Sequence, residues 1–175
     1  MEPARTSKPL SGTLPWTRSC FVCGEANPRG LQLRSRVNDG RVVLDYRMRE
    51  TDRGWRHIVH GGITITLLDE VMTWAAILEQ RGACVAAEIT CRLRQPISAG
   101  RQVRAEAFVT GRKSRMILTE AQLVGAEGEV LAAATGKYMP MPADQVELCA
   151  DDFVNAPDAI PVKHIFGAHH LASCS

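Results

Sequence analysis

One segment of the chain, residues 61–80, limits the possible folds more than any other. It opens with two adjacent glycines, Gly61 and Gly62, and continues as a nearly unbroken apolar run. Apolar residues on almost every side are typical of a helix that is buried all round. We therefore expect a central helix from about Gly62 to Gln80, with Gly82 as its C-cap.

The few polar residues of this helix gather on one side. At about 100° per residue, one face of roughly 60° of arc carries Gly62, Thr66, Asp69 and Thr73, with Glu70 just beside it. A buried carboxylate is rare unless it is paired or used in chemistry. Asp69 is therefore a candidate functional residue, and an ion pair with an arginine such as Arg92 or Arg94 is the structural alternative.

The rest of the pattern is strand. Residues 42–48 alternate apolar and polar after the hairpin-type turn Asn38-Asp39-Gly40. Beyond the helix, residues 84–94, 102–110, 115–124 and 129–138 show the same period of two, separated by turn residues that include Gly111 to Ser114. Consecutive strands with tight turns predict an antiparallel meander. The expected class is α+β, with an antiparallel sheet wrapped around one long buried helix.

Composition excludes several classes. The chain has 175 residues, 45% of them hydrophobic, and a net charge of +2, so neither a nucleic-acid partner nor a membrane surface is indicated. We find no apolar run of the ~18 residues that a membrane-spanning helix needs. The N-terminus lacks the apolar core of a signal peptide, which favours a cytoplasmic protein. We expect a flexible leader at 1–19, one domain at 20–140, and a short helix and tail at 141–175.

Six cysteines are scattered along the chain, and only Cys20 and Cys23 form a close pair. A structural zinc ion needs four ligands, and the other candidates are distant in sequence: Cys149, His169, His170 and Cys174. The pair also does not open a helix after a strand, as a thioredoxin-like motif would. We expect no metal site, and the sequence assigns the cysteine pair no role.

The segment from His60 to Glu70 reads His-Gly-Gly-x4-Leu-Leu-Asp-Glu, and it leads into the buried helix and then the strands. This order resembles the hot-dog-fold acyl-CoA thioesterases of the PaaI type. The lead-in Cys20-Phe-Val-Cys-Gly-x-x-Asn-Pro-x-Gly-Leu31 resembles a subset of that family. The resemblance in layout covers roughly residues 20–140.

The resemblance implies roles for particular residues. Asp69 would act as general base or nucleophile, the Gly61 amide as oxyanion donor, and His60 would orient the loop or contact the substrate carbonyl. It also implies a homodimer or dimer of dimers that shares its active site across the subunit interface. A polarised amide at a helix N-terminus suits the negative charge that thioester hydrolysis builds on oxygen. A thiolate leaves readily, so the reaction needs no cofactor.

Further residues are candidates for binding an acyl-CoA substrate. They are Gly62, Thr66, Glu70 and Thr73 on the helix, and Arg112, Lys113 and Arg115 in a basic turn that could meet CoA phosphates. The two threonines could instead bond back to their own helix, and the basic turn could be a solvated one.

Two positions depart from the family pattern. Gly54 stands where an asparagine is expected, and Ala86 where a water-holding serine is expected. A non-catalytic acyl-CoA-binding or ligand-sensing module on the same fold is therefore the alternative function. A hot-dog hydratase or dehydratase ranks last, because no matching His–Asp/Glu string occurs.

Overall fold

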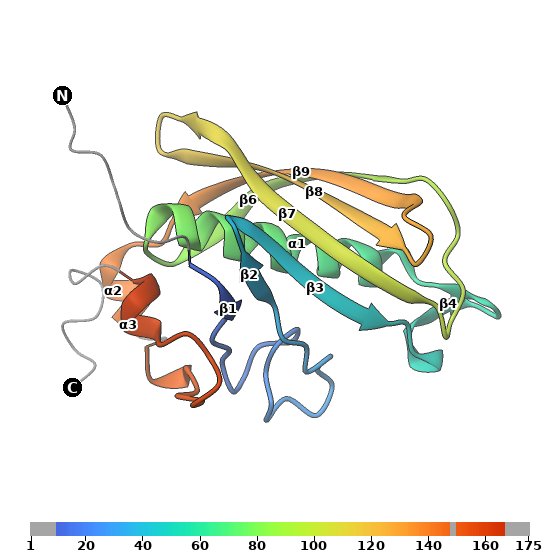
Figure 1. The fold of residues 1–175 in the computed structure, drawn as a ribbon, viewed down its shortest axis with the longest axis horizontal. Coiled ribbons are helices and arrows are strands. Elements are labelled where there is room, and N and C mark those ends of the chain that lie inside the picture. The colour runs from blue at the N-terminus through green and yellow to red at the C-terminus, as the bar shows by residue number, and fades with distance from the viewer. Residues whose placement is uncertain (1–9, 148–149, 167–175) are drawn as a thin grey trace.

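The computed structural model describes residues 10–147 and 150–166. One antiparallel sheet of seven strands curves around the long helix α1 (Gly61–Gln80), as Figure 1 shows. The spatial order of its strands is β1 (Gly12–Thr13), β2 (Arg36–Asn38), β3 (Arg41–Arg47), β7 (Gln102–Lys113), β8 (Met116–Gly125), β9 (Val130–Pro140) and β6 (Cys84–Leu93). Smaller elements are η1 (Glu50–Asp52), the hairpin of β4 (Arg53–Trp55) and β5 (Ile58–Val59), α2 (Ala143–Glu147), η2 (Ala150–Asp152) and α3 (Val162–Ile165).

The predicted central helix is confirmed. Its side chains Leu67, Leu68, Val71 and Met72 are fully enclosed between the helix and the concave face of the sheet. The C-cap differs from the prediction, because Arg81 and not Gly82 adopts the left-handed conformation, with a φ of 58°. The Arg81 N–H donates to the Ile77 carbonyl at 2.8 Å, and this bond closes the last turn.

By length and average hydropathy, α1 could cross a membrane, which differs from the expectation drawn from the sequence. In the fold it is the central helix of the domain, and β3, β6, β7, β8 and β9 all contact it. Burial against a sheet selects the same apolar composition as burial in lipid.

The turn between β2 and β3 forms as its residues predict. Asp39 and Gly40 both have positive φ, 48° and 75°, and Asn38 pairs with Arg41 on either side of them. Two left-handed residues in a two-residue loop make a type I′ turn, whose twist matches that of the flanking strands. The register sets Val42, Leu44 and Tyr46 on the buried face of β3.

The predicted four-strand meander is only partly correct. β7, β8 and β9 are consecutive neighbours, but β6 pairs with β9 and β7 pairs with β3. Residues 94–101 therefore cross the end of the sheet and do not form a hairpin. Alternation of apolar and polar residues identifies a strand. It does not show which edge of the sheet the next strand will join when the connection is long. As a result, β6 has one side that pairs with none of the described strands.

Both ends of the described chain differ from the predicted leader and tail. Residues 10–19 include β1, which pairs with β2, and the side chains of Leu14 and Trp16 are buried. At the other end, Ile165 and Phe166 pack into the same core. The two segments lie together, since the Ile160 N–H donates to the Thr13 carbonyl at 2.8 Å. The domain thus extends beyond the expected limits of 20 and 140.

Candidate active site

His60 forms the N-cap of α1. Its Nδ1 accepts the Gly62 N–H at 2.9 Å, and its carbonyl accepts the Ile63 N–H at 2.9 Å. A neutral imidazole that accepts at Nδ1 carries its proton at Nε2. The side chain is exposed, so this proton is available as a donor to a ligand above the helix end. His60 therefore has the structural role of an N-cap, and its contact with a substrate carbonyl stays a prediction.

The chain before the helix is held in place by Asp52. The His60 N–H donates to the Asp52 carbonyl at 2.8 Å. The buried Asp52 carboxylate in turn accepts the Tyr46 hydroxyl at 2.6 Å and the Arg49 N–H at 2.7 Å. These contacts anchor the start of the helix to β3, and the sequence reading did not identify them.

Gly61 is the first residue of α1, so its N–H is one of those that a helix leaves free. Among the described residues we find no protein acceptor for it. Gly61 lines a hollow of about 290 Å³ with Trp55, Ile58 and Leu93. A Cβ on Gly61 would lie 2.8 Å from the Leu93 Cδ1. Gly61 thus borders this surface hollow and brings no side chain of its own into it.

Asp69 lies halfway along α1 and is partly buried. Its Oδ1 accepts the Tyr138 hydroxyl at 2.7 Å and the Thr73 hydroxyl at 3.3 Å. The proposed pairing with Arg92 or Arg94 does not occur among the ion pairs of the described residues. Two hydroxyl donors hold the carboxylate in one orientation.

Tyr138 is the site residue that the sequence reading missed. It is fully buried on β9, and burial together with the charge of Asp69 raises the pKa of its hydroxyl. A buried tyrosine needs a hydrogen-bond partner for its hydroxyl. From the sequence, a tyrosine on a buried strand face can be expected to need such a partner. Only the fold identifies that partner as Asp69.

Glu70 has surroundings different from those of its neighbour Asp69. Its Oε1 accepts the Trp74 Nε1–H at 3.1 Å. Burial raises the pKa of the Glu70 carboxyl to about 8, and the negative charges of Cys20 and Asp69 add to the effect. Glu70 therefore keeps its proton at neutral pH. Glu70 lies beneath the segment that carries Cys20 and Cys23.

The remaining predicted residues on the helix behave in two ways. Thr66 donates its hydroxyl to the Gly62 carbonyl at 2.9 Å, which is the bond back to its own helix that was considered from the sequence. Thr73 instead donates to Asp69. Of the two threonines, Thr73 is therefore the one that contacts the candidate catalytic carboxylate.

The basic residues Arg112, Lys113 and Arg115 are not brought to this site within one chain. Arg112 and Lys113 belong to β7, and the turn lies one step later, at Ser114, whose φ is 57°. Arg112 pairs with Glu79 near the C-terminal end of α1. Asp69 and Glu79 are 10 positions apart in the helix, which corresponds to about 15 Å along its axis.

The two departures from the family pattern have definite places. Gly54 lies against His60, since a Cβ there would meet the His60 Cδ2 at 3.1 Å. Ala86 is exposed on β6 and pairs with Tyr138 on β9, next to an irregularity in the register between Ala86 and Glu88. Both positions thus flank the residues discussed above, and neither supplies a polar side chain.

Within residues 10–147 and 150–166, no group of three or more metal-ligating side chains comes together. Four of the residues considered as partners for Cys20 and Cys23 lie outside the described residues, namely Cys149, His169, His170 and Cys174.

Comparison with known proteins finds one matching family model. Residues 57–132 match the model of the thioesterase superfamily. No curated protein matches the chain by sequence. This match supports thioester hydrolysis in general and includes His60, Gly61 and Asp69.

Solved structures share the fold. A thioesterase superfamily protein has a TM-score of 0.64 and 23% identity over 70% of this chain, which spans only 60% of that protein. The Escherichia coli PaaI protein from the phenylacetic acid degradation operon has a TM-score of 0.55 and 22% identity. The match covers 59% of this chain and 74% of the PaaI chain. A mutant of the Thermus thermophilus PaaI has a TM-score of 0.53 and 25% identity. The match covers 58% of this chain and 86% of the mutant chain.

These likenesses agree with the sheet and the central helix described above. Residues 57–132 match the thioesterase superfamily model, and the domain that contains them has the hot-dog fold that the PaaI protein also has.

Proposed function

We propose that the protein hydrolyses acyl-CoA thioesters to the free acid and CoA. The observation that carries the proposal is the pair of groups on α1: a carboxylate, Asp69, fixed by two hydroxyls, and a free N-terminal amide at Gly61. The first can activate water or attack directly, and the second can stabilise an oxyanion.

In this mechanism, the reacting carbonyl oxygen binds at the Gly61 amide. Asp69 takes a proton from water as the water oxygen attacks the carbonyl carbon, or the carboxylate attacks first and water then hydrolyses the anhydride. The carbon–sulfur bond breaks, and CoA departs as a thiolate that takes up a proton. Removal of one oxyanion donor costs about 3–4 kcal/mol of barrier in such sites.

The two groups cannot act on one carbonyl from the same chain. Eight residues separate Gly61 from Asp69, which is about 12 Å along the helix axis. Both groups must approach within about 3 Å of the same carbonyl. A second copy related by a two-fold axis, with its helix antiparallel, would bring its own Asp69 near Gly61. The proposed enzyme is therefore a homodimer with shared sites.

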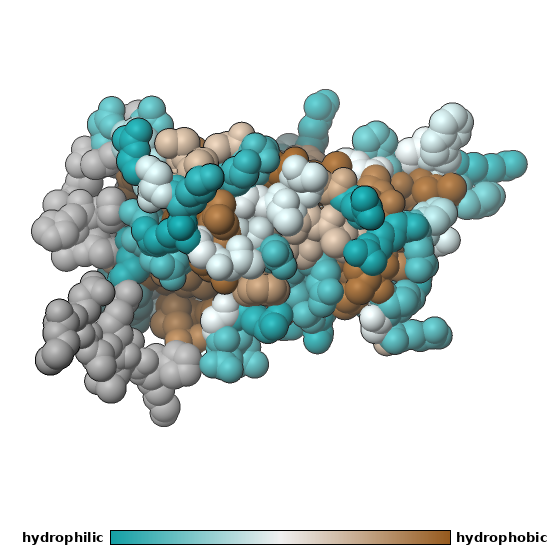
Figure 2. All heavy atoms as spheres, turned by 90° about the horizontal axis from the view of Figure 1, so that it is seen from above, coloured by the Kyte–Doolittle hydropathy of each residue, from teal (hydrophilic) through white to brown (hydrophobic). Residues whose placement is uncertain are grey.

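The surface of the protein favours an interface on the side of β6. Apolar atoms reach the surface between hydrophilic side chains in the view over β8 and β9 (Figure 2). The large exposed apolar residues include Val85 and Leu93, at the two ends of β6, with 45% and 51% of their surface accessible. β6 also offers unpaired backbone groups along one side. Pairing of two β6 edges would cover all of these groups.

The first test is the variant Asp69→Asn, assayed by thiol release from a panel of acyl-CoA esters. General-base or nucleophilic roles predict a loss of about 100-fold or more in kcat/KM. The matched control is Asp39→Asn in the exposed β2–β3 turn, where asparagine tolerates the positive φ. Unchanged turnover in a folded Asp69→Asn protein would refute the role. Saturable binding of the esters by the wild type without any turnover would favour the non-catalytic binding module.

The second test addresses the shared site. Two inactive variants, Asp69→Asn and Gly61→Ala, are mixed, unfolded and refolded together. Random pairing gives half mixed dimers, each with one intact pair of groups, so about a quarter of wild-type activity should return. Continued inactivity of mixtures that demonstrably contain mixed dimers would contradict the shared site.

A further inference from the structure

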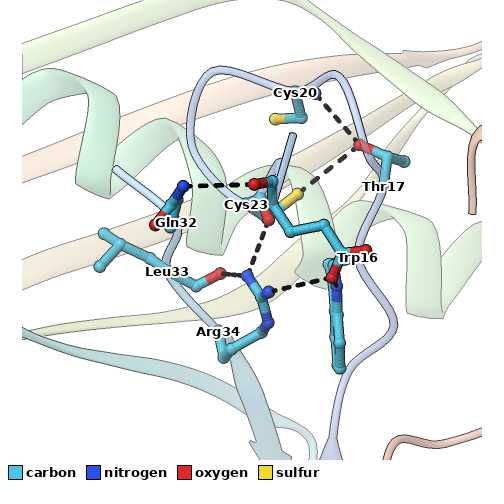
Figure 3. Close-up of polar contacts among 8 residues, drawn as sticks. Trp16, Thr17, Cys20, Cys23, Gln32, Leu33 and Arg34 are labelled. Atoms are coloured by element: carbon cyan, nitrogen blue, oxygen red, sulfur yellow. Dashed lines mark hydrogen bonds and ion pairs between the residues drawn. The ribbon is translucent and has the colours of Figure 1, made fainter. Parts of the chain in front are cut away.

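The Cys20–Cys23 pair is the one motif in the sequence that hydrolysis does not use. It lies in a tight turn between β1 and β2, drawn in Figure 3. The Gly24 N–H donates to the Cys20 carbonyl at 2.9 Å, and the Val22 N–H donates to the Cys20 sulfur at 3.2 Å. A Cβ on Gly24 would lie only 2.3 Å from the Cys20 carbonyl oxygen, so this turn requires glycine.

The turn is fastened by polar contacts from the segment that follows it. Arg34 lies over the Trp16 ring at 4.0 Å and donates to the Cys23 carbonyl at 2.7 Å. The Trp16 Nε1–H donates to Glu25 at 2.9 Å. These contacts, shown in Figure 3, fix the position of Cys23 relative to the rest of the domain. The turn is therefore built to hold the two sulfurs in place.

The two thiols differ in exposure and in charge. Cys23 is buried, with 6% of its surface accessible, whereas Cys20 is partly exposed. A hydrogen bond with the Cys23 thiol, together with the N–H groups of Val22, Cys23 and Gly24, lowers the pKa of Cys20 to about 6. The same thiol contact and burial raise the pKa of Cys23. The pair thus consists of an accessible thiolate and an adjacent, buried thiol.

We propose that Cys20 and Cys23 form a peroxide-reactive dithiol that converts reversibly to a disulfide. The Cys20 thiolate attacks one oxygen of hydrogen peroxide, the O–O bond breaks, and Cys20 becomes a sulfenic acid while hydroxide leaves and takes up a proton. The Cys23 sulfur then displaces the hydroxyl group as water, forming the disulfide. The two thiols are oxidised, the peroxide is reduced, and a dithiol reductant reverses the change.

The site is connected to the helix that carries Asp69. The negative charge on Cys20 raises the pKa of the Glu70 carboxyl, and the charge of Glu70 in turn raises the pKa of Cys23. Formation of the disulfide removes both that charge and the Cys23 S–H. The redox state of the turn is therefore transmitted to the residue next to Asp69.

The test treats the full-length protein with hydrogen peroxide, blocks free thiols and digests with trypsin. The peptide Ser19–Arg29 contains both cysteines and no other. It should lose two hydrogen atoms in mass and regain them with dithiothreitol. The matched control is Cys91→Ser, which alters another partly exposed cysteine and should leave this conversion unchanged. If the peptide keeps its mass, or gains only irreversible oxygen, the proposal is overturned.

Two variants separate the steps. Cys23→Ser should stop at a sulfenic acid on Cys20 that a dimedone probe captures, and Cys20→Ser should leave Cys23 unreacted. Independently, Cys20 of the wild type should react with iodoacetamide at pH 6 roughly ten times as fast as a free thiol. A Cys20 rate no higher than that of Cys91, in protein with a native circular dichroism spectrum, would refute the assignment of Cys20 as the attacking thiolate.

Discussion

Glu70 allows the electrostatics of the site to be tested apart from catalysis. Burial raises the pKa of its carboxyl from the ordinary 4.5 to about 8, so the folded protein retains a proton that the unfolded chain releases. The stabilising contribution of this proton is complete below pH 4.5 and is lost as the pH rises towards 8. Glu70→Gln keeps a neutral side chain of similar shape and should remove this pH dependence.

The magnitude follows from the size of the shift. Each pH unit between the two pKa values lowers the free energy of unfolding by about 1.4 kcal/mol. Between pH 5 and pH 7.5 the wild type should therefore lose about 3 kcal/mol relative to Glu70→Gln. A difference of this size corresponds to roughly 6–12 °C in Tm for a domain of this length.

Urea unfolding of both proteins at several pH values in this range measures the difference directly. Glu120→Gln is the matched control, because Glu120 is exposed on β8 and its substitution should give a difference that does not vary with pH. If the difference in unfolding free energy between the wild type and Glu70→Gln also did not vary with pH, the assignment of a buried, neutral Glu70 under the Cys20–Cys23 turn would be refuted.

Two further substitutions test the groups on and around α1. Tyr138→Phe removes the 2.7 Å hydrogen bond to Asp69, so we expect the free energy of unfolding to fall by about 1–2 kcal/mol. We also expect kcat/KM to fall by about tenfold, because the carboxylate is held less firmly. Unchanged stability and turnover would show that this bond is unimportant. Gly61→Ala should lower the free energy of unfolding by less than about 1 kcal/mol, because the new Cβ meets only the end of the exposed Leu93 side chain. The same Cβ should block the approach of the substrate carbonyl to the Gly61 amide. A variant with full thioesterase activity would exclude the Gly61 amide as oxyanion donor.

Several features were predictable from the sequence because they depend on neighbouring residues. The all-round apolar character of residues 61–80 fixed α1, and Asp39-Gly40 fixed the turn between β2 and β3. The two adjacent glycines located the helix start to within one residue. The extent of the domain was not predictable in this way, since the burial of Leu14 and Phe166 depends on contacts between the two ends of the described chain.

The sequence by itself therefore determined the central helix, the alternating strands and the position of the candidate carboxylate, because each follows from local periodicity and conformational preference. Tertiary structure alone decided that β6 joins β9, that Tyr138 holds Asp69, and that Glu70 lies under a pair of cysteines about fifty residues earlier in the chain. These outcomes depend on which distant segments meet, and a local pattern does not encode such pairings. The different environments of two adjacent carboxyl groups are the clearest example: their positions in the sequence are equivalent, and only packing separates their chemistry.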